Sequence, residues 1–116
     1  MSSIFVFGSN TAGRHGKGAA LTAVKEYGAK YGQGVGFQGN SYAIPTKNAA
    51  LHSLALNYIA EYVEEFIRFA YAHPEYTFNV TPIGCGLVGY EPYQIAPMFK
   101  GVPENVYLPD VFKEYL

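Results

Sequence analysis

The sequence predicts a three-layer α/β/α domain with a mixed central sheet. Short apolar segments rich in β-branched and aromatic residues alternate along the chain with segments of helical periodicity, a pattern typical of layered α/β folds. Two glycine-rich loops each follow a predicted strand, where ligand-binding loops lie in such sheets. A chain of 116 residues has the size of one domain, which we assign to residues 1–116.

The first predicted strand leads through a glycine-rich loop into a helix. Ile4–Phe7 is a short apolar run that predicts a buried strand, and Ala19–Tyr27 predicts a helix that ends at Gly28. Glycines in the loop between them let a ligand approach the main chain, and the first amides of a helix are free donors that favour an anion. This order of elements therefore predicts a phosphate-binding site.

A β-hairpin is predicted to follow. Gly39 and Asn40 form a turn pair between the segments Val35–Gln38 and Ser41–Ile44. Because Pro45 cannot donate a hydrogen bond to a neighbouring strand, the second strand is expected to end there or to lie at an edge.

Apolar residues at three- and four-residue spacing predict one long amphipathic helix over residues 49–72. Asn48 is expected to cap its first turn, and Pro74 to close it. The apolar stripe consists of Leu51, Leu54, Ala55, Tyr58, Tyr62, Phe66, Phe69 and Ala70.

The C-terminal part of the chain predicts two more strands and two short helices. Tyr76–Ile83 is rich in β-formers and leads into the second glycine-rich loop. A short helix is expected over Pro92–Phe99, beginning near Glu91, and a last strand over Val106–Leu108. Asp110 is expected to cap a terminal helical turn.

Composition and charge limit the classes of partner. The net charge of −1 argues against a general electrostatic attraction to nucleic acid or to an anionic membrane. No apolar run approaches the ~20 residues of a membrane span, and the single cysteine, Cys85, suits a reducing compartment. No leader sequence precedes the first strand, so we expect a cytoplasmic protein. The histidines and the cysteine have no metal-ligand spacing, so neither a metal nor a cofactor is expected.

Three segments of the chain match the motifs of one known family. They are residues 10–20, 42–47 and 82–90, and together they resemble the macro domain, a family that binds ADP-ribose. Residues 10–20, NTAGRHGKGAA, are similar to the family's first loop, in which an asparagine precedes small residues and glycines that open a helix. Residues 82–90, PIGCGLVGY, are similar to its second loop, which follows a buried strand and ends in glycine and an aromatic residue. Residues 42–47, YAIPTK, resemble the strand that ends in a catalytic lysine in the compact branch containing the terminal ADP-ribose glycohydrolase.

The resemblance implies a macro-like domain whose partner is ADP-ribose or an ADP-ribose-derived small molecule or conjugate. It implies that Asn10 hydrogen-bonds the distal ribose and that Tyr90 packs against it. The two glycine loops would hold the diphosphate from opposite sides. The ligand-binding residues implied in this way are Asn10, Gly13, Gly16, Lys17, Gly18, Gly84, Cys85, Gly86, Leu87, Val88, Gly89 and Tyr90.

A hydrolytic role follows from the same resemblance as an alternative. Its candidate catalytic residues are Asn10, Lys47 and His15. In the glycohydrolase, an aspartate follows the Gly-Cys-Gly-Leu segment and supports covalent capture of the ribose by the lysine. In this chain that position holds Val88, which cannot exchange a proton.

Three functions stay open on the sequence alone. The first is a module that recognises or sequesters ADP-ribose, and the second is an ADP-ribosyl hydrolase or a phosphatase acting on phosphorylated ADP-ribose. The third is an oligomeric structural protein whose aromatic surface binds another chain and whose glycine loops are tight turns. Each candidate residue also has a purely structural interpretation of its own: Asn10 stabilises its own turn, His15 and Lys47 are solvated, Cys85 is a small turn residue and Tyr90 only packs. The sequence does not specify an oligomeric state.

Overall fold

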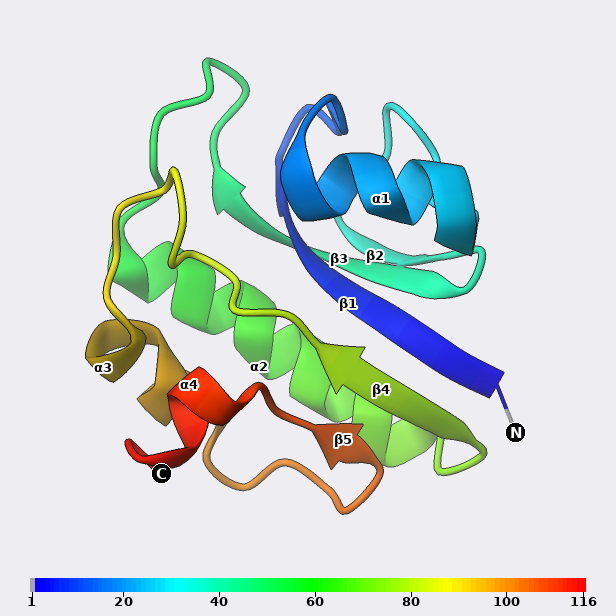
Figure 1. Cartoon of the computed structure of the whole chain (residues 1–116), viewed down its shortest axis with the longest axis vertical. Helices are drawn as coiled ribbons and strands as arrows, with labels where there is room; N and C mark the ends of the chain where they lie inside the picture. Colours follow the sequence, from blue (N-terminus) through cyan, green and yellow to red (C-terminus); the bar gives the residue numbers. More distant parts are fainter. Residues whose placement is uncertain (1) are drawn as a thin grey trace.

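The structure, a computed structural model describing residues 2–116, has a five-stranded sheet with helices on both faces (Figure 1). The strand order is β2-β3-β1-β4-β5, so β1 lies at the centre. The elements in chain order are β1 Ser2–Asn10, α1 Gly18–Tyr27, β2 Gly36–Gln38, β3 Ser41–Lys47, α2 Leu56–Ala72, β4 Tyr76–Val80, α3 Pro92–Ile95, the 3-10 helix η1 Ala96–Phe99, β5 Val106–Tyr107 and α4 Asp110–Lys113.

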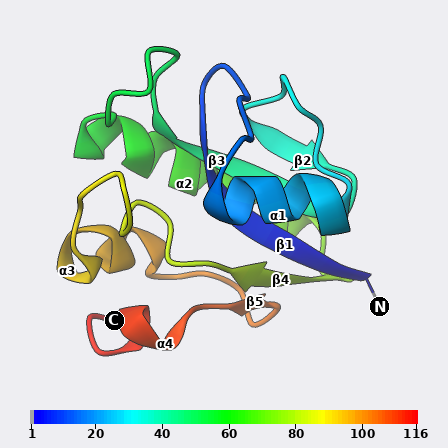
Figure 2. The ribbon, with the colours of Figure 1, turned by 45° about the horizontal axis from the view of Figure 1, so that its top comes forward.

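The sheet is mixed, as predicted. β1 pairs in parallel with β3 and with β4, and β5 pairs in parallel with β4. β2 runs antiparallel to β3 across the turn at Gly39 and Asn40, which confirms the hairpin. α1 covers one face of the sheet, while α2 and the C-terminal helices lie on the other (Figure 2). The three-layer α/β/α architecture with a mixed sheet is therefore confirmed.

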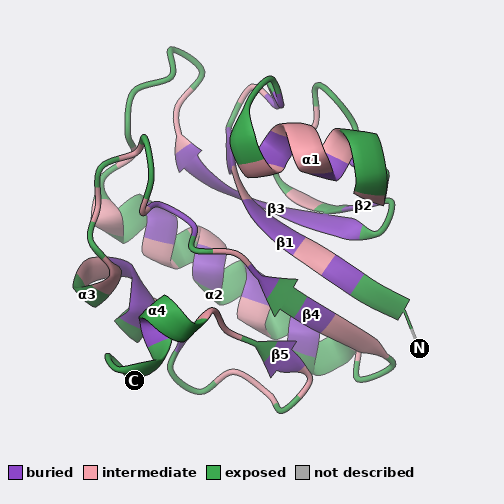
Figure 3. Cartoon of the chain, in the orientation of Figure 1, coloured by how far each residue is buried: buried purple, intermediate pink, exposed green. Residues whose placement is uncertain are grey.

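Side chains of the central strands alternate between two apolar clusters, one on each face of the sheet. Ile4 packs on the α2 side, whereas Phe7 packs against α1. The α1 cluster is built largely of alanines, among them Ala20 and Ala23, whose small side chains let the helix lie close to the strands. The α2 cluster contains the fully buried rings of Phe66, Phe78, Phe99 and Phe112. Buried positions therefore concentrate on the strands between the helices (Figure 3).

The prediction for the start of the long helix was wrong. α2 begins at Leu56, not at residue 49, and Asn48 does not cap it. Instead, the Asn48 side-chain oxygen accepts hydrogen bonds from the amides of Ala50 and His52, at 2.9 and 3.0 Å. This turn leaves Leu51 in the left-handed region, with φ of 65°, which stops a helix from forming. Residues 48–55 are a loop, although their leucines have helical spacing.

The expectation that the second strand of the hairpin ends at Pro45 or lies at an edge of the sheet was wrong, because β3 runs through Pro45 to Lys47 and lies between β2 and β1. β2 pairs only with residues 41–43 of β3, so beyond Ala43 that side of β3 has no neighbouring strand. On the other side β3 continues to pair with β1 through Pro45 and, after a shift in register, through Lys47.

Other boundaries also differ from the prediction. β1 spans Ser2–Asn10 rather than Ile4–Phe7, and β5 ends at Tyr107 rather than Leu108. β4 ends at Val80 rather than Ile83, because Pro82 has no amide hydrogen with which to continue the pairing. Asp110 does not cap α4: it is the first helical residue, and Pro109 occupies the cap position.

The helix predicted over residues 92–99 is confirmed as α3 followed by η1. Glu91 and Gln94 form a reciprocal capping box at its start, in agreement with the predicted beginning near Glu91. None of the helices within residues 2–116 is long and apolar enough to cross a membrane.

Candidate functional site

A cavity of about 580 Å³ lies where β1, β3 and β4 end. Its lining comes from the end of β1, the end of β3, and residues 81–84 that follow β4. The first glycine loop, which we define as residues 11–17, borders it together with the start of α1. The second glycine loop, residues 84–90, borders it on another side. The two glycine loops therefore meet at one cavity, as the sequence predicted for loops after neighbouring parallel strands.

Asn10 and Lys47 lie side by side in the lining of this cavity. They are register partners at the ends of β1 and β3, and both line the cavity. The Asn10 side-chain oxygen accepts a hydrogen bond from the Arg14 amide at 2.9 Å, and its nitrogen donates to the Arg14 carbonyl at 3.0 Å. A carboxamide has two donor hydrogens and two acceptor sites. Asn10 therefore shapes the first glycine loop and keeps one donor and one acceptor site for a ligand.

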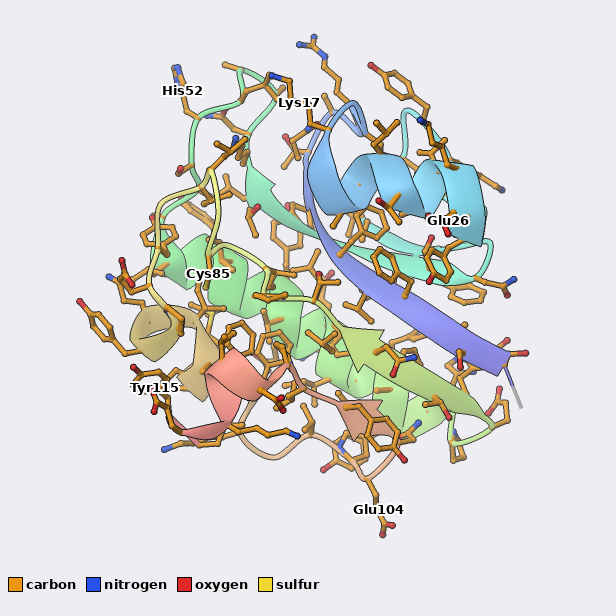
Figure 4. The ribbon with its side chains drawn as sticks, viewed as in Figure 1. Lys17, Glu26, His52, Cys85, Glu104 and Tyr115 are labelled. Carbon is orange, nitrogen blue, oxygen red and sulfur yellow. The ribbon has the colours of Figure 1, made fainter. Side chains whose placement is uncertain are left out.

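The cavity lining is cationic, although the chain as a whole has a net charge of −1. Arg14, Lys17 and Lys47 line it, and no aspartate or glutamate does. The ion pairs among residues 2–116 use Arg68, His73 and Lys113 and leave the three lining cations out. Figure 4 shows Lys17 at the start of α1. This concentration of positive charge favours an anionic ligand.

The start of α1 adds backbone donors to the same cavity. The first hydrogen bond of the helix is donated by the Leu21 amide to the Lys17 carbonyl, so the amides of Gly18, Ala19 and Ala20 have no partner in the helix. All three residues line the cavity, and Lys17 provides no side-chain cap. The ten-residue helix thus presents its positive dipole end to the ligand space.

The second glycine loop contributes a further group of free amides. The amides of Gly86, Leu87 and Val88 donate to no acceptor within residues 2–116, and these residues line the cavity. The amides of Cys85 and Gly89 are instead used in turns inside the loop. The sequence predicted that the second glycine loop binds the ligand along its whole length. In the structure, residues 86–88 combine a free amide with a place in the cavity lining, whereas Cys85, Gly89 and Tyr90 do not.

At two positions of the cavity lining, neither the backbone conformation nor a close neighbour requires glycine. A Cβ atom added at Gly16 or Gly86 would meet nothing within 4 Å, and neither residue has a left-handed φ. By contrast, Gly18 and Gly84 have φ of 57° and 74°, which favour glycine for conformational reasons. Gly16 and Gly86 therefore leave open space in the cavity that a side chain would fill.

Gly13 and His15 do not line the cavity. Gly13 packs against the backbone of residues 32–33, where an added Cβ would come within 2.3 Å of the Gly32 carbonyl carbon. The polar loop around His15 predicted a solvated side chain, but His15 is buried, with 1% of it exposed. Its Nε2 donates to the Gln33 carbonyl at 2.8 Å, and its ring lies edge-on to Phe7. Both residues join the first glycine loop to residues 32–33 and do not face the cavity.

Cys85, Gly89 and Tyr90 likewise lie outside the cavity lining. Cys85 packs against the α2-side cluster (Figure 4), and burial raises the pKa of its thiol, with a smaller contribution from Glu91. A thiol of raised pKa is a poor nucleophile, so its place as a small turn residue suits it better. The Tyr90 hydroxyl donates to the Leu54 carbonyl at 2.7 Å and so joins the second glycine loop to the 48–55 loop.

Sequence reasoning missed Leu51 as a cavity residue. It was assigned to the apolar stripe of a helix, whereas it lies in the 48–55 loop and lines the cavity. A signal for this was present, because asparagine readily bonds to the backbone two residues ahead and begins a turn. Within residues 2–116 no three histidine, cysteine or acidic side chains are grouped to hold a metal ion.

Comparisons with known proteins found a similar fold and no indication of a ligand. No family model matches the chain, and no curated protein does. A solved structure described as a protein of unknown function from Bacteroides thetaiotaomicron is similar, with a TM-score of 0.65 and 16% sequence identity. The similarity covers 93% of this chain and 88% of that one. The α/β fold is therefore shared with a protein of unknown function.

Proposed function

We propose that the protein binds ADP-ribose, or a nucleotide that contains it, as a module that recognises or sequesters this ligand. The observation that carries the proposal is the pair of free-amide groups, residues 18–20 and 86–88, that border one cavity with three cations. Backbone amides and cations together bind phosphate oxygens. Two such groups, one at the start of α1 and one on the second glycine loop, suit a diphosphate better than a single phosphate.

The ribose end of the ligand is assigned from Asn10. Its remaining donor and acceptor can each bond a sugar hydroxyl, which also acts as both. The cavity volume of about 580 Å³ lies within the range of small-molecule sites. The geometry favours a diphosphate joined to a sugar, and the resemblance of the two glycine loops to those of macro domains is the reason for choosing ADP-ribose among such ligands.

The proposal is tested by titrating the purified protein with ADP-ribose in a calorimeter. We expect a dissociation constant roughly in the micromolar range that weakens as salt rises, because charged groups contribute. Lys17→Ala should weaken binding about 5- to 10-fold through the loss of one cation at the phosphates. Lys25→Ala is the matched control, because Lys25 lies on α1, the helix that Lys17 precedes, but outside the cavity lining. Equal effects of the two variants, or no binding by the wild type, would contradict the proposal.

The position of Lys47 beside Asn10 favours hydrolysis at the distal ribose as a second candidate. The same samples are incubated with an ADP-ribosylated peptide and with ADP-ribose 1″-phosphate, and products are separated by chromatography. A binding module releases no product above the protein-free rate. An enzyme would turn over one substrate, and Lys47→Ala would lower that rate about 100-fold or more, as expected for loss of a nucleophile. With Val88 at the position of the family's aspartate, we expect no turnover.

A further inference from the structure

One nitrogen of the buried His15 ring has no hydrogen-bond partner. The side chain is 1% exposed, and among residues 2–116 its Nδ1 is the one buried side-chain nitrogen or oxygen left without a partner. Buried polar atoms are nearly always paired, so an exception calls for a physical reason. Because His15 does not line the cavity, contact with the ligand does not provide that reason.

The contacts of the ring show that it is neutral. Nε2 lies 2.8 Å from the Gln33 carbonyl oxygen, and because a carbonyl only accepts, Nε2 carries the hydrogen. Nδ1 of a neutral ring then holds a lone pair and needs no acceptor. A protonated ring would place a second N–H at Nδ1, where the described residues offer no partner. Burying an unpaired donor together with a charge costs free energy, so the ring is neutral in this position.

The rings that surround His15 carry no negative charge. From β1, the Phe7 ring lies edge-on, with the ring centroids 5.2 Å apart. From the 31–35 loop, the Tyr31 ring also lies edge-on, at 6.3 Å between centroids. Tyr31 is the titratable side chain among these contacts, and a phenol is uncharged at physiological pH. The surroundings of the ring therefore offer nothing that would stabilise a positive charge.

The charged residues near His15 do not compensate a charge on its ring either. Arg14 and Lys17, on either side of it in the chain, are cations. On α1, which packs on the same side of the sheet, Lys25 and Glu26 are exposed to solvent. No ion pair within residues 2–116 includes His15. The ring therefore takes up a proton only when it leaves this position for water.

Movement of the ring would displace the loop that carries two of the cavity cations. His15 is one residue from Arg14 and two from Lys17, and both of these line the cavity. The bond from His15 to the Gln33 carbonyl joins this loop to residues 31–35. Without that bond, the two cations lose an attachment that fixes their positions. Ordering a mobile loop on binding costs affinity, so the ligand would bind more weakly.

We infer that His15 is a pH-dependent anchor of the first glycine loop, which holds Arg14 and Lys17 at the cavity when its ring is neutral and releases them when the ring is protonated. The step is reversible: a proton from water binds the Nδ1 lone pair, and the ring leaves its bond to Gln33. Because the released ring binds a proton and the buried ring does not, stability and ligand affinity both fall as the pH falls. The inference rests on the proposed function for its ligand and adds the regulation of that site.

Calorimetric titration with ADP-ribose at about pH 7.5 and about pH 5.5 tests the inference, because histidine ordinarily titrates between them. The diphosphate of ADP-ribose does not titrate in this range. We expect the wild type to bind about 10-fold more weakly at the lower pH. His15→Gln keeps an N–H donor for the Gln33 carbonyl and cannot take up a proton, so its affinity should change by less than about 2-fold.

The other two histidines provide matched controls. His52 extends away from the ribbon in Figure 4, and neither His52 nor His73 lines the cavity. His52→Gln and His73→Gln should therefore keep the pH dependence of affinity that the wild type has.

Two further measurements need no ligand. Between the same pH values, the melting temperature of the wild type should fall by roughly 4 °C or more beyond the fall in His15→Gln. Two-bond ¹⁵N–¹H correlation NMR of the imidazole should show the His15 hydrogen on Nε2 at the higher pH. The NMR measurement uses the wild type, so it does not depend on how well a variant folds.

The opposite results overturn the inference. If His15→Gln keeps the wild-type pH dependence of affinity, another group takes up the proton. If affinity rises as the pH falls, a charge on His15 attracts the phosphates and the ring is not an anchor. If NMR finds the ring protonated at the higher pH, its surroundings do not hold it neutral. If the wild type binds no ADP-ribose at either pH, the proposed function fails by itself, and equal melting-temperature changes in the wild type and His15→Gln would then also exclude the anchor.

Discussion

Replacing Gly86 by glutamate is expected to weaken ADP-ribose binding about 100-fold or more and to leave the fold intact. The added Cβ meets nothing within 4 Å, and Gly86 has no left-handed φ, so the chain accepts a side chain there. The new carboxylate enters a cavity lined by Arg14, Lys17 and Lys47. It pairs with these cations and repels the phosphates that would otherwise bind them.

Titration calorimetry measures the affinity, and thermal unfolding checks the fold. The expected result is a lost binding signal with a melting temperature within a few degrees of the wild type. Val111→Glu is the matched control, because it adds the same charge at an exposed position of α4 outside the cavity lining. If Gly86→Glu binds ADP-ribose as tightly as Val111→Glu does, the ligand does not occupy this cavity.

A Gly86→Ala arm separates charge from bulk. Alanine at an unstrained position lowers the entropy of the unfolded chain and should raise the free energy of unfolding by about 0.4–1 kcal/mol. Any weakening of binding by alanine then measures how closely the ligand approaches the backbone. A stabilised variant that binds less well would explain why glycine stands here, since nothing in the chain requires it.

The elements that the sequence predicted best are those specified by local signals. Gly28, with φ of 74°, ends α1 as expected, and the Gly39-Asn40 turn forms the hairpin. The start of α2 was missed because leucine spacing in residues 48–55 imitates a helical stripe. One side chain, that of Asn48, decides the matter by bonding to the backbone of its own loop. Periodicity reports where apolar residues recur and does not report such a competing bond.

The site was predictable in outline for a different reason. Both glycine loops were expected to converge on one cleft because each follows a predicted strand. The proximity of Asn10 and Lys47 was not predicted, because it depends on the parallel pairing of β1 with β3. The roles of Gly13 and His15 were not predicted either, because they depend on contacts with residues 31–35, a loop distant in sequence. Their place in the motif predicted ligand contact, whereas the His15 side chain and the Gly13 backbone are buried.

Replacing Gly34 by alanine is expected to lower the free energy of unfolding by about 3 kcal/mol, the upper range for overpacking. An added Cβ would lie 2.2 Å from the Asn10 carbonyl oxygen and 2.9 Å from two Thr11 backbone atoms. Backbone atoms cannot turn aside as a flexible side chain can. The Asn10 carbonyl also accepts the Gly13 amide, so moving it disturbs the first turn of the glycine loop.

Urea denaturation measures the loss of stability, and calorimetry with ADP-ribose measures its effect on the site. Because Asn10 shapes the loop through Arg14, a displaced Asn10 should also weaken binding about 10-fold in the protein that remains folded. Gly16→Ala is the control: its Cβ enters open space, so stability should stay the same or rise. Equal stability of Gly34→Ala and Gly16→Ala would mean that residues 31–35 do not hold the glycine loop in position. In that case the first glycine loop would keep its position at the cavity without the contacts it makes with residues 31–35.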